Sequence, residues 1–256
     1  FNYLMAIHNL YKPIGISPLD LIENFKKKNP ELINEKMTYA GRLDPIADGV
    51  VLILSGEDRF DKDDFLKLDK KYKAQILFGI KSDTFDILGM PSDPIDTSTL
   101  DIKSKVKLDE LIGTHNIKVP SYSSVIVGKK PLFEWARSNQ LDQISIPERE
   151  MTIKSAELIE SSTVESQDLL NQIETKIKLV QGDFRQDEII ESWRSILSTT
   201  NSKFSTITID LHVTSGTYIR SIAHELGAKL GCGAILFSLT RTAVGNHNIH
   251  DSVKTV

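Results

Sequence analysis

Apolar residues recur with helical spacing near the start of the chain. The apolar positions on one face of residues 17–28 are Leu21, Ile22 and Phe25. Ser17 suits a helix N-cap, with an acidic residue three positions on. Pro30 ends the pattern, because the residue before a proline disfavours helical backbone. An amphipathic helix is therefore predicted here.

Two more amphipathic helices are predicted between residues 161 and 205, with a turn at Gly182 between them. Their apolar faces consist of Leu169, Leu170, Ile173 and Ile177 in the first, and Ile189, Ile190, Trp193 and Leu197 in the second. Pieces rich in Ser, Thr and Asn flank the pair. This pattern predicts a helical hairpin inserted into the fold at about 161–205.

Strand patterns surround these helices. The run from Val50 to Leu54 suits a strand buried on both faces, and residues 72–80 and 206–213 alternate with strand period. Residues 152–160 and 233–244 are further strand candidates, and short helices are expected near 108–113, 132–137 and 216–231. Strands and helices mix without regular β-α-β alternation, so the fold class is α/β in the mixed α+β sense. We expect one domain over 1–256, built around a largely antiparallel sheet.

Composition narrows the function classes. The 256 residues are 40% hydrophobic and 26% charged, and the net charge of -4 gives no global attraction for nucleic acid. No apolar run is long enough for a membrane span, and the first residues do not have the pattern of a secretory signal. Cys232 is the only cysteine, so an internal disulfide is impossible and a cysteine-based metal site is disfavoured. A reducing, cytoplasmic setting is expected.

One carboxylate has a distinctive context. Asp44 stands before Pro45 in "YAGRLDPIADGVVLILSGE", just ahead of the predicted buried strand. An Asp before a proline forms turns readily, and a turn at a strand entrance also presents its side chain to a cleft. Phosphate loops, dinucleotide fingerprints and paired zinc ligands are absent from the sequence, so no cofactor and no metal are expected.

This stretch resembles the catalytic loop of pseudouridine synthases. Four further stretches are similar, in family order, to tRNA pseudouridine-55 synthases of the TruB type. They are "LYKPIGISPLDLIENFKK", "KKYKAQILFGIKSDTFDILG", "VPSYSSVIVGKKPLFEWAR" and "SGTYIRSIAHELGAKLGCGAILFSLTRTAVG". The resemblance covers most of the chain outside 161–205. It implies a pseudouridine synthase fold and isomerisation of uridine to pseudouridine at position 55, in the T loop of tRNA.

The resemblance also implies roles for individual residues. Asp44 is the catalytic carboxylate, acting either as a nucleophile on C1′ or as a base at C2′. Its guanidinium partner is Arg220, with Arg42 as the weaker candidate. Tyr72 stacks on the uridine and is the candidate for proton transfer at C5. Tyr218 and Leu239 match the other uridine-pocket positions.

RNA binding is assigned to local positive charge. The segment from 119 to about 150, with Lys129, Lys130 and Arg137, corresponds to the family's mobile segment that grips the T arm. The predicted hairpin is richer in acidic than basic residues and is expected to lie away from this basic face. We expect a monomer, and no PUA-type domain after Val244.

This chain departs from the family pattern at three positions. Tyr39 stands where a base-packing His is usual, Arg42 where a small residue is usual, and Leu88 where an Asp is usual. Tyr39 offers a flat ring that can still contact RNA. Two alternative functions follow: an RNA-binding or RNA-folding protein with weak or lost activity, and a pseudouridine synthase that acts on another RNA.

Overall fold

The computed structural model describes residues 6–97, 100–199 and 202–255. Within these ranges, one ten-stranded sheet contains, in spatial order, β12 (Val253–Lys254), β1 (Ala6–Lys12), β3 (Ala47–Ser55), β10 (Ala234–Val244), β4 (Lys70–Phe78), β9 (Lys203–Val213), β8 (Glu148–Glu165) and β5 (Gly113–Lys118). β2 (Met37–Ala40) pairs with β3, and β11 (His247–Asn248) with β10. The β1–β12 and β3–β10 pairs are parallel and the other pairs are antiparallel. The predicted mixed fold with a largely antiparallel sheet is confirmed.

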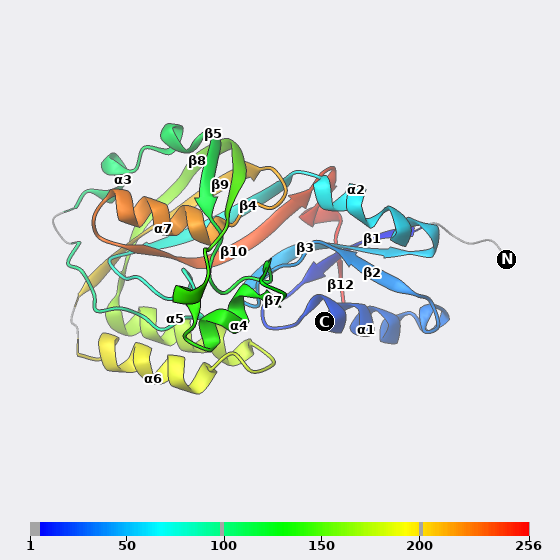
Figure 1. Cartoon of the computed structure of the whole chain (residues 1–256), viewed down its shortest axis with the longest axis horizontal. Coiled ribbons are helices and arrows are strands. Elements are labelled where there is room, and N and C mark those ends of the chain that lie inside the picture. The colour runs from blue at the N-terminus through cyan, green and yellow to red at the C-terminus, as the bar shows by residue number, and fades with distance from the viewer. Residues whose placement is uncertain (1–5, 98–99, 200–201, 256) are drawn as a thin grey trace.

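Helices pack on both faces of the central strands (Figure 1). Within the described residues they are α1 (Pro18–Lys28), α2 (Lys62–Lys67), α3 (Ile102–Lys105), α4 (Leu132–Arg137), α5 (Ser166–Leu179), α6 (Gln186–Leu197) and α7 (Ile219–Lys229). In β4, Tyr72, Ala74 and Ile76 belong to the apolar cluster that includes α7, whereas Leu77 belongs to the cluster that includes α5 and α6. Side chains that alternate along a strand therefore divide the core into two layers.

The predicted helices form for the reasons that their sequences suggest. Ser17 accepts a hydrogen bond from the Asp20 amide at 3.1 Å, and the Asp20 carboxylate accepts from the Ser17 amide at 2.9 Å, which completes a capping box. The apolar faces of α5 and α6 are buried against the sheet. Around residue 108 the predicted short helix is a single 3₁₀ turn, Leu108–Leu111.

The boundary of the hairpin differs from the prediction. Residues 161–165 continue β8 and pair with residues 203–207 of β9, so the Ser/Thr-rich flank is strand and not a loop. The pairing partner lies beyond α6, which a local pattern of polar residues could not indicate. We call α5, the turn 180–185 and α6 the helical hairpin.

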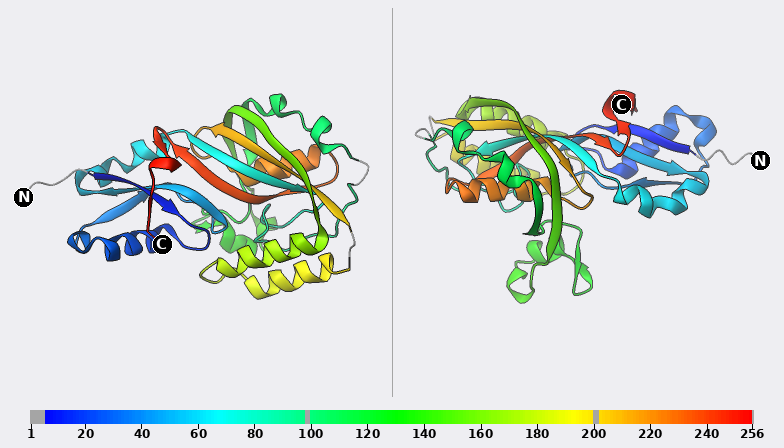
Figure 2. Two further views of the ribbon diagram at one scale, coloured as in Figure 1. Left: turned by 180° about the vertical axis from the view of Figure 1, so that it is seen from behind. Right: turned by 90° about the horizontal axis from the view of Figure 1, so that it is seen from above.

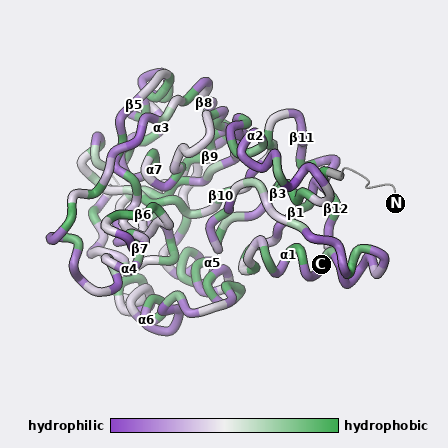
Figure 3. Tube along the Cα trace, turned by 45° about the vertical axis from the view of Figure 1, so that its right-hand side comes forward, coloured by the Kyte–Doolittle hydropathy of each residue, from purple (hydrophilic) through white to green (hydrophobic). Residues whose placement is uncertain are grey.

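β5 and the first part of β8 extend out of the body and carry a looped tip (Figure 2). The tip contains α4 and the short pair β6 (Ile126–Val127) and β7 (Lys130–Pro131). Hydrophilic residues are frequent along this segment and along the outer loops (Figure 3). No helix in the described part of the chain is both long and apolar enough to cross a membrane.

Candidate active site

The loop that carries Asp44 connects β2 to β3 and is held from two sides. Its own turn closes through a hydrogen bond from the Ala47 amide to the Asp44 carbonyl, 3.0 Å. Behind it, the buried Arg241 donates to the carbonyls of Val50 at 2.6 Å and of Arg42 at 3.1 Å. In front, the Gly15 amide donates to the Pro45 carbonyl at 2.8 Å. The loop backbone is therefore fixed by partners remote in sequence.

Asp44 binds a buried arginine. Nε of Arg220 lies 2.8 Å from Oδ2 of Asp44, and Nη2 donates to Oδ1 at 3.3 Å. The Arg220 side chain is 6% exposed and that of Asp44 is 35% exposed, so the carboxylate faces outward from a buried cation. The predicted pair between Asp44 and Arg220 is present. Arg42, the weaker candidate, donates instead to the Tyr39 hydroxyl at 3.2 Å.

A second carboxylate joins this pair. Oδ2 of Asp86 lies 3.6 Å from Nε of Arg220, and Oδ1 accepts from the Thr84 hydroxyl at 2.6 Å and the Leu88 amide at 2.9 Å. Burial raises the pKa of Asp86 to about 6, with Arg220 opposing the shift and Asp44 adding to it. Asp86 is not among the site residues predicted from the sequence. The available signal was the Asp-Thr-x-Asp pattern at 83–86, inside the family-like stretch "KKYKAQILFGIKSDTFDILG".

Arg220 also donates hydrogen bonds to two backbone carbonyls, which help to hold this buried cation in place. Its Nη1 donates to the Thr84 carbonyl at 2.9 Å and its Nη2 to the Tyr122 carbonyl at 3.4 Å. The guanidinium thus joins the Asp44 loop, the 83–88 loop and the segment that begins at residue 119. Planar, multiple donors make arginine suited to such a junction.

The predicted uridine-pocket residues lie around this junction. Tyr72 and Leu239 are buried in the same apolar cluster as Leu43, the residue before Asp44. Tyr218 is half-buried at the N-cap of α7, two residues before Arg220. The structure therefore gathers these residues with Asp44, and their contacts with a uridine stay a prediction.

Tyr39 lies at the edge of the site, on β2. It is half-buried, with the Lys62 ammonium 5.1 Å from its ring centroid. With Arg42 on its hydroxyl, the ring has a cation on two sides. Two of the three residues at which the chain departs from the family pattern, Tyr39 and Arg42, thus contact each other.

The predicted RNA-gripping lysines lie apart from Asp44, on the looped tip. Lys129 is exposed with φ of 77°, and the ammonium of Lys130 lies 3.7 Å from the Trp135 ring centroid. Arg137 donates to the Asp183 carbonyl at 2.6 Å, in the turn of the helical hairpin. The expectation that the hairpin lies away from the basic face is therefore wrong at its turn. The overall acidity of the hairpin did not reveal this contact.

Lys12, in the "YKPIG" turn, is fully buried. Its ammonium donates to the Pro13 carbonyl at 3.0 Å. Burial lowers the pKa of Lys12 to about 8, and the negative charges of Asp48 and Asp44 partly oppose that shift. Lys12 therefore adds positive charge close to Asp44 and Asp48.

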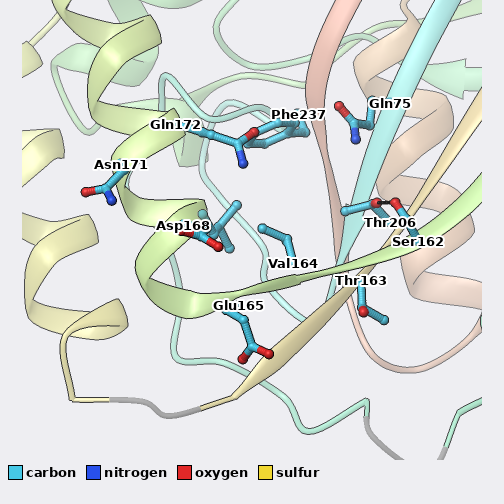
Figure 4. Close-up of a pocket in the computed structure, with 11 residues that line it drawn as sticks. Gln75, Ser162, Thr163, Val164, Glu165, Asp168, Asn171, Gln172, Thr206 and Phe237 are labelled. Carbon is cyan, nitrogen blue, oxygen red and sulfur yellow. Dashed lines mark hydrogen bonds between the residues drawn. The ribbon is translucent and has the colours of Figure 1, made fainter.

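No cluster of potential metal ligands exists among the described residues. The cavity in Figure 4, of about 490 Å³, lies between α5 and the strands β4, β8 and β9. Gln75 lines it, and since Gln75 is an odd number of positions from Tyr72 along β4, the two side chains point to opposite faces. This cavity is thus separate from the Asp44 site.

Comparison with known proteins agrees with this geometry. The family described as "TruB family pseudouridylate synthase (N terminal domain)" matches residues 29–184, more than half of the chain. The chain belongs to the TruB pseudouridylate synthase family. The matched range includes the Asp44 loop, the 83–88 loop, the looped tip and α5.

Curated TruB relatives extend the match over nearly the whole chain. The tRNA pseudouridine synthase B of Clostridium kluyveri is 26% identical over 97% of this chain and 70% of its own length. That of Blochmanniella floridana is 28% identical over 96% of this chain and 80% of its own length.

Solved structures share the TruB fold at low identity. A Cbf5-Nop10-Gar1 complex matches with a TM-score of 0.57 and 18% identity, over 98% of this chain and 52% of that chain. An H/ACA RNP bound to a substrate RNA containing 2′-deoxyuridine matches with a TM-score of 0.53 and 18% identity, over 97% of this chain and 50% of that chain. The chain spans about half the length of these structures, and at this identity they show the fold alone.

Proposed function

We propose that this protein isomerises uridine to pseudouridine at position 55 of tRNA, with Asp44 as the catalytic carboxylate. The observation that carries the proposal is the pair in which an outward-facing Asp44 is held by the buried Arg220, Nε to Oδ2 at 2.8 Å. Membership of the TruB family and relatives named tRNA pseudouridine synthase B support the reaction and the substrate.

The reaction breaks the N1–C1′ bond of uridine, turns the base, and rejoins it to the sugar through C5. The proton on C5 is lost and N1 gains one, so the change is an isomerisation. Attack on C1′ and proton removal at C2′ both require an ionised carboxylate at the sugar. Arg220 gives the ionised Asp44 a cationic partner. Because Arg220 also contacts Asp86 and the carbonyls of Thr84 and Tyr122, its position would not change when the substrate binds.

The remaining site residues would hold the uridine. An enzyme that acts on a base must take it out of its stack and hold it between flat or apolar side chains. Tyr72 and Leu239 supply such surfaces in the cluster around Leu43, and the Tyr72 hydroxyl is our candidate for proton transfer at C5. Tyr218 would contribute a second ring beside Arg220.

We further propose that the T arm binds to the surface around Tyr39, Arg42 and Lys62 and to the looped tip. Arg42 and Lys62 flank Tyr39, and Lys129 is exposed on the tip, so these cations would meet phosphates. The Asp44 cluster is complete within one chain, which favours action as a monomer. A tRNA substrate and a single cysteine favour the cytoplasm.

The test is conversion of a full-length tRNA transcript by purified protein, with site-by-site pseudouridine mapping and no added cofactor. We expect one new pseudouridine, at position 55. Binding of the transcript without any pseudouridine would favour an RNA-binding role on this scaffold. Conversion confined to ribosomal or other RNA would favour a different substrate.

A further inference from the structure

The turn of the helical hairpin is fixed by its own side chains. Nε2 of Gln186 donates to the carbonyls of Val180 at 3.0 Å and Gly182 at 2.6 Å, and Oε1 accepts from the Phe184 amide at 2.8 Å. Arg185, between them, takes the left-handed backbone with φ of 62°. Such a conformation is uncommon for a residue with a side chain, so the surrounding contacts hold it.

Arg185 reaches from this turn to the loops that bind Arg220. Its Nη2 donates to Oδ2 of Asp83 at 2.9 Å, and its guanidinium carbon lies 4.9 Å from the Tyr122 ring centroid. Asp83 also accepts from the Met90 amide at 2.8 Å, so it closes its own loop. Arg185 thus binds the residue next to Thr84 and stacks on Tyr122, and Thr84 and Tyr122 provide the two carbonyls that bind Arg220.

A second contact from the hairpin reaches the same loop. The fully buried Trp193 of α6 donates from Nε1 to the Ile87 carbonyl at 3.1 Å. Ile87 follows Asp86, whose carboxylate lies on Arg220. The 83–88 loop is therefore held at both ends by α6 and the residue at its N-cap.

A third contact reaches the Asp44 loop through the N-terminal turn. The Gln181 amide donates to the Gly15 carbonyl at 2.9 Å, and the Gly15 amide donates to the Pro45 carbonyl at 2.8 Å. A Cβ at Gly15 would lie 2.0 Å from the Leu179 carbonyl oxygen, so only glycine allows this approach. The hairpin thus contacts the 83–88 loop, Tyr122 and Gly15, and Gly15 in turn binds the Asp44 loop.

We propose that the helical hairpin is a positioning element of the active site and that Arg185 is its positioning residue. Arg185 fixes Asp83 and Tyr122, these fix the carbonyls that hold Arg220, and Arg220 holds Asp44 at the angle that the reaction needs. Arg185 is not expected to touch the reacting uridine. The inference rests on the proposed isomerase function.

The experiment compares Arg185→Ala, Arg185→Lys and wild type on a tRNA transcript, at saturating enzyme in a single turnover. Small misplacements of catalytic groups cost up to about a hundredfold in rate, so we expect Arg185→Ala to lose about tenfold to a hundredfold. The dissociation constant for tRNA should change by less than about threefold, because Arg185 is proposed to act on positioning and not on binding. Arg185→Lys should recover part of the rate, since it reaches Asp83 without stacking as a planar group on Tyr122.

Arg194→Ala is the matched control. It removes an arginine from α6, the helix that Arg185 caps, where Arg194 binds Glu174 at 2.7 Å and makes no hydrogen bond or ion pair with the 83–88 loop as the structure describes it. Wild-type rate is expected for this variant. Hydrogen–deuterium exchange gives a readout independent of activity: amides of residues 83–90 should exchange faster in Arg185→Ala than in wild type and Arg194→Ala.

Two results would overturn the positioning role. One is an Arg185→Ala protein with wild-type rate and wild-type exchange in residues 83–90. The other is an equal loss in Arg194→Ala, which would mean general destabilisation. If wild type itself forms no pseudouridine on any RNA, the proposed function fails, and the exchange experiment still decides whether Arg185 fixes the loop.

Discussion

Two arginine–carboxylate clusters in this protein have nearly the same shortest distance and very different surroundings. In the first, Arg220 lies 2.8 Å from Asp44 and 3.6 Å from Asp86, and its side chain is 6% exposed. In the second, Arg194 lies 2.7 Å from Glu174, which also binds Lys178 at 2.7 Å, and the Arg194 side chain is 46% exposed. Distance alone does not distinguish them.

The two clusters differ in the burial of the arginine and in whether the carboxylate is still accessible to a further partner. In the surface cluster the Glu174 carboxylate, 15% exposed, pairs with two cations whose side chains are 46% and 59% exposed, so water screens the pairs from the side of the cations. In the buried cluster one cation serves two carboxylates and two carbonyls, and only Asp44 faces outward. Asp44 is held by a buried cation and still has an exposed side, so it can reach a substrate. Glu174 is paired with cations of α5 and α6, so it is suited to holding these two helices together.

Arg220→Met should give the largest effect, because it leaves Asp86 buried without its cation. Breaking a buried ion pair from one side costs about 3–5 kcal/mol in the free energy of unfolding. We expect that loss in urea denaturation, together with loss of pseudouridine formation. Arg220→Lys is the companion variant. It should fold and yet have a strongly reduced rate, because an ammonium cannot span four partners. Wild-type activity in either variant would contradict the role given to the buried cluster.

Asp86→Asn should change the pH dependence of stability. The pKa of Asp86 in the folded protein is about 6, above its ordinary value, chiefly because the group is buried. Between about pH 4 and 6 the folded state therefore keeps a proton that the unfolded chain has lost, so the free energy of unfolding falls as pH rises through this window. The fall should be on the order of 3 kcal/mol and should level off above pH 6.

Asn cannot titrate, so in Asp86→Asn the free energy of unfolding should no longer fall between about pH 4 and 6, whatever the effect of the substitution on absolute stability. Urea denaturation at four pH values from 4 to 7, for wild type and variant, measures the difference. The same slope in both proteins would show that Asp86 is not the group that takes up the proton.

Glu174→Gln should give the smallest effect. Pairing with Arg194 first, and then with Lys178, lowers the pKa of Glu174 to about 2, and the two ion-pair distances of 2.7 Å show that both pairs are well formed. Surface pairs nevertheless contribute only about 0–1 kcal/mol, so we expect a loss below about 1 kcal/mol in urea denaturation and an unchanged rate of pseudouridine formation. A loss comparable with that of Arg220→Met would mean that the two clusters do not differ as described.

Much of the fold was predictable because local patterns determined it. The capping box at Ser17, the alternating strand at 206–213 and the apolar faces of α5 and α6 all formed as predicted. The family motifs likewise predicted the Asp44–Arg220 pair across 176 positions of sequence.

The missed features depend on tertiary contacts. Asp86 lies in a polar, proline-containing stretch that is typical of an exposed loop, yet it is buried where Arg220 and Trp193 reach that loop from distant helices. Arg185 follows a glycine turn, where nothing in the sequence indicates that Asp83 and Tyr122 lie opposite. Lengths and charges of segments could not reveal these pairings.

The most direct measurement is single-turnover pseudouridine formation at position 55 of tRNA by Asp44→Asn. The control is Asp64→Asn, an exposed carboxylate paired with Lys67 at 2.9 Å. We expect Asp44→Asn to fold, to bind tRNA and to form no detectable pseudouridine, while Asp64→Asn retains the wild-type rate. An Asp44→Asn protein whose rate stays within about tenfold of wild type, a barrier change of only about 1.4 kcal/mol, would contradict a catalytic role for Asp44.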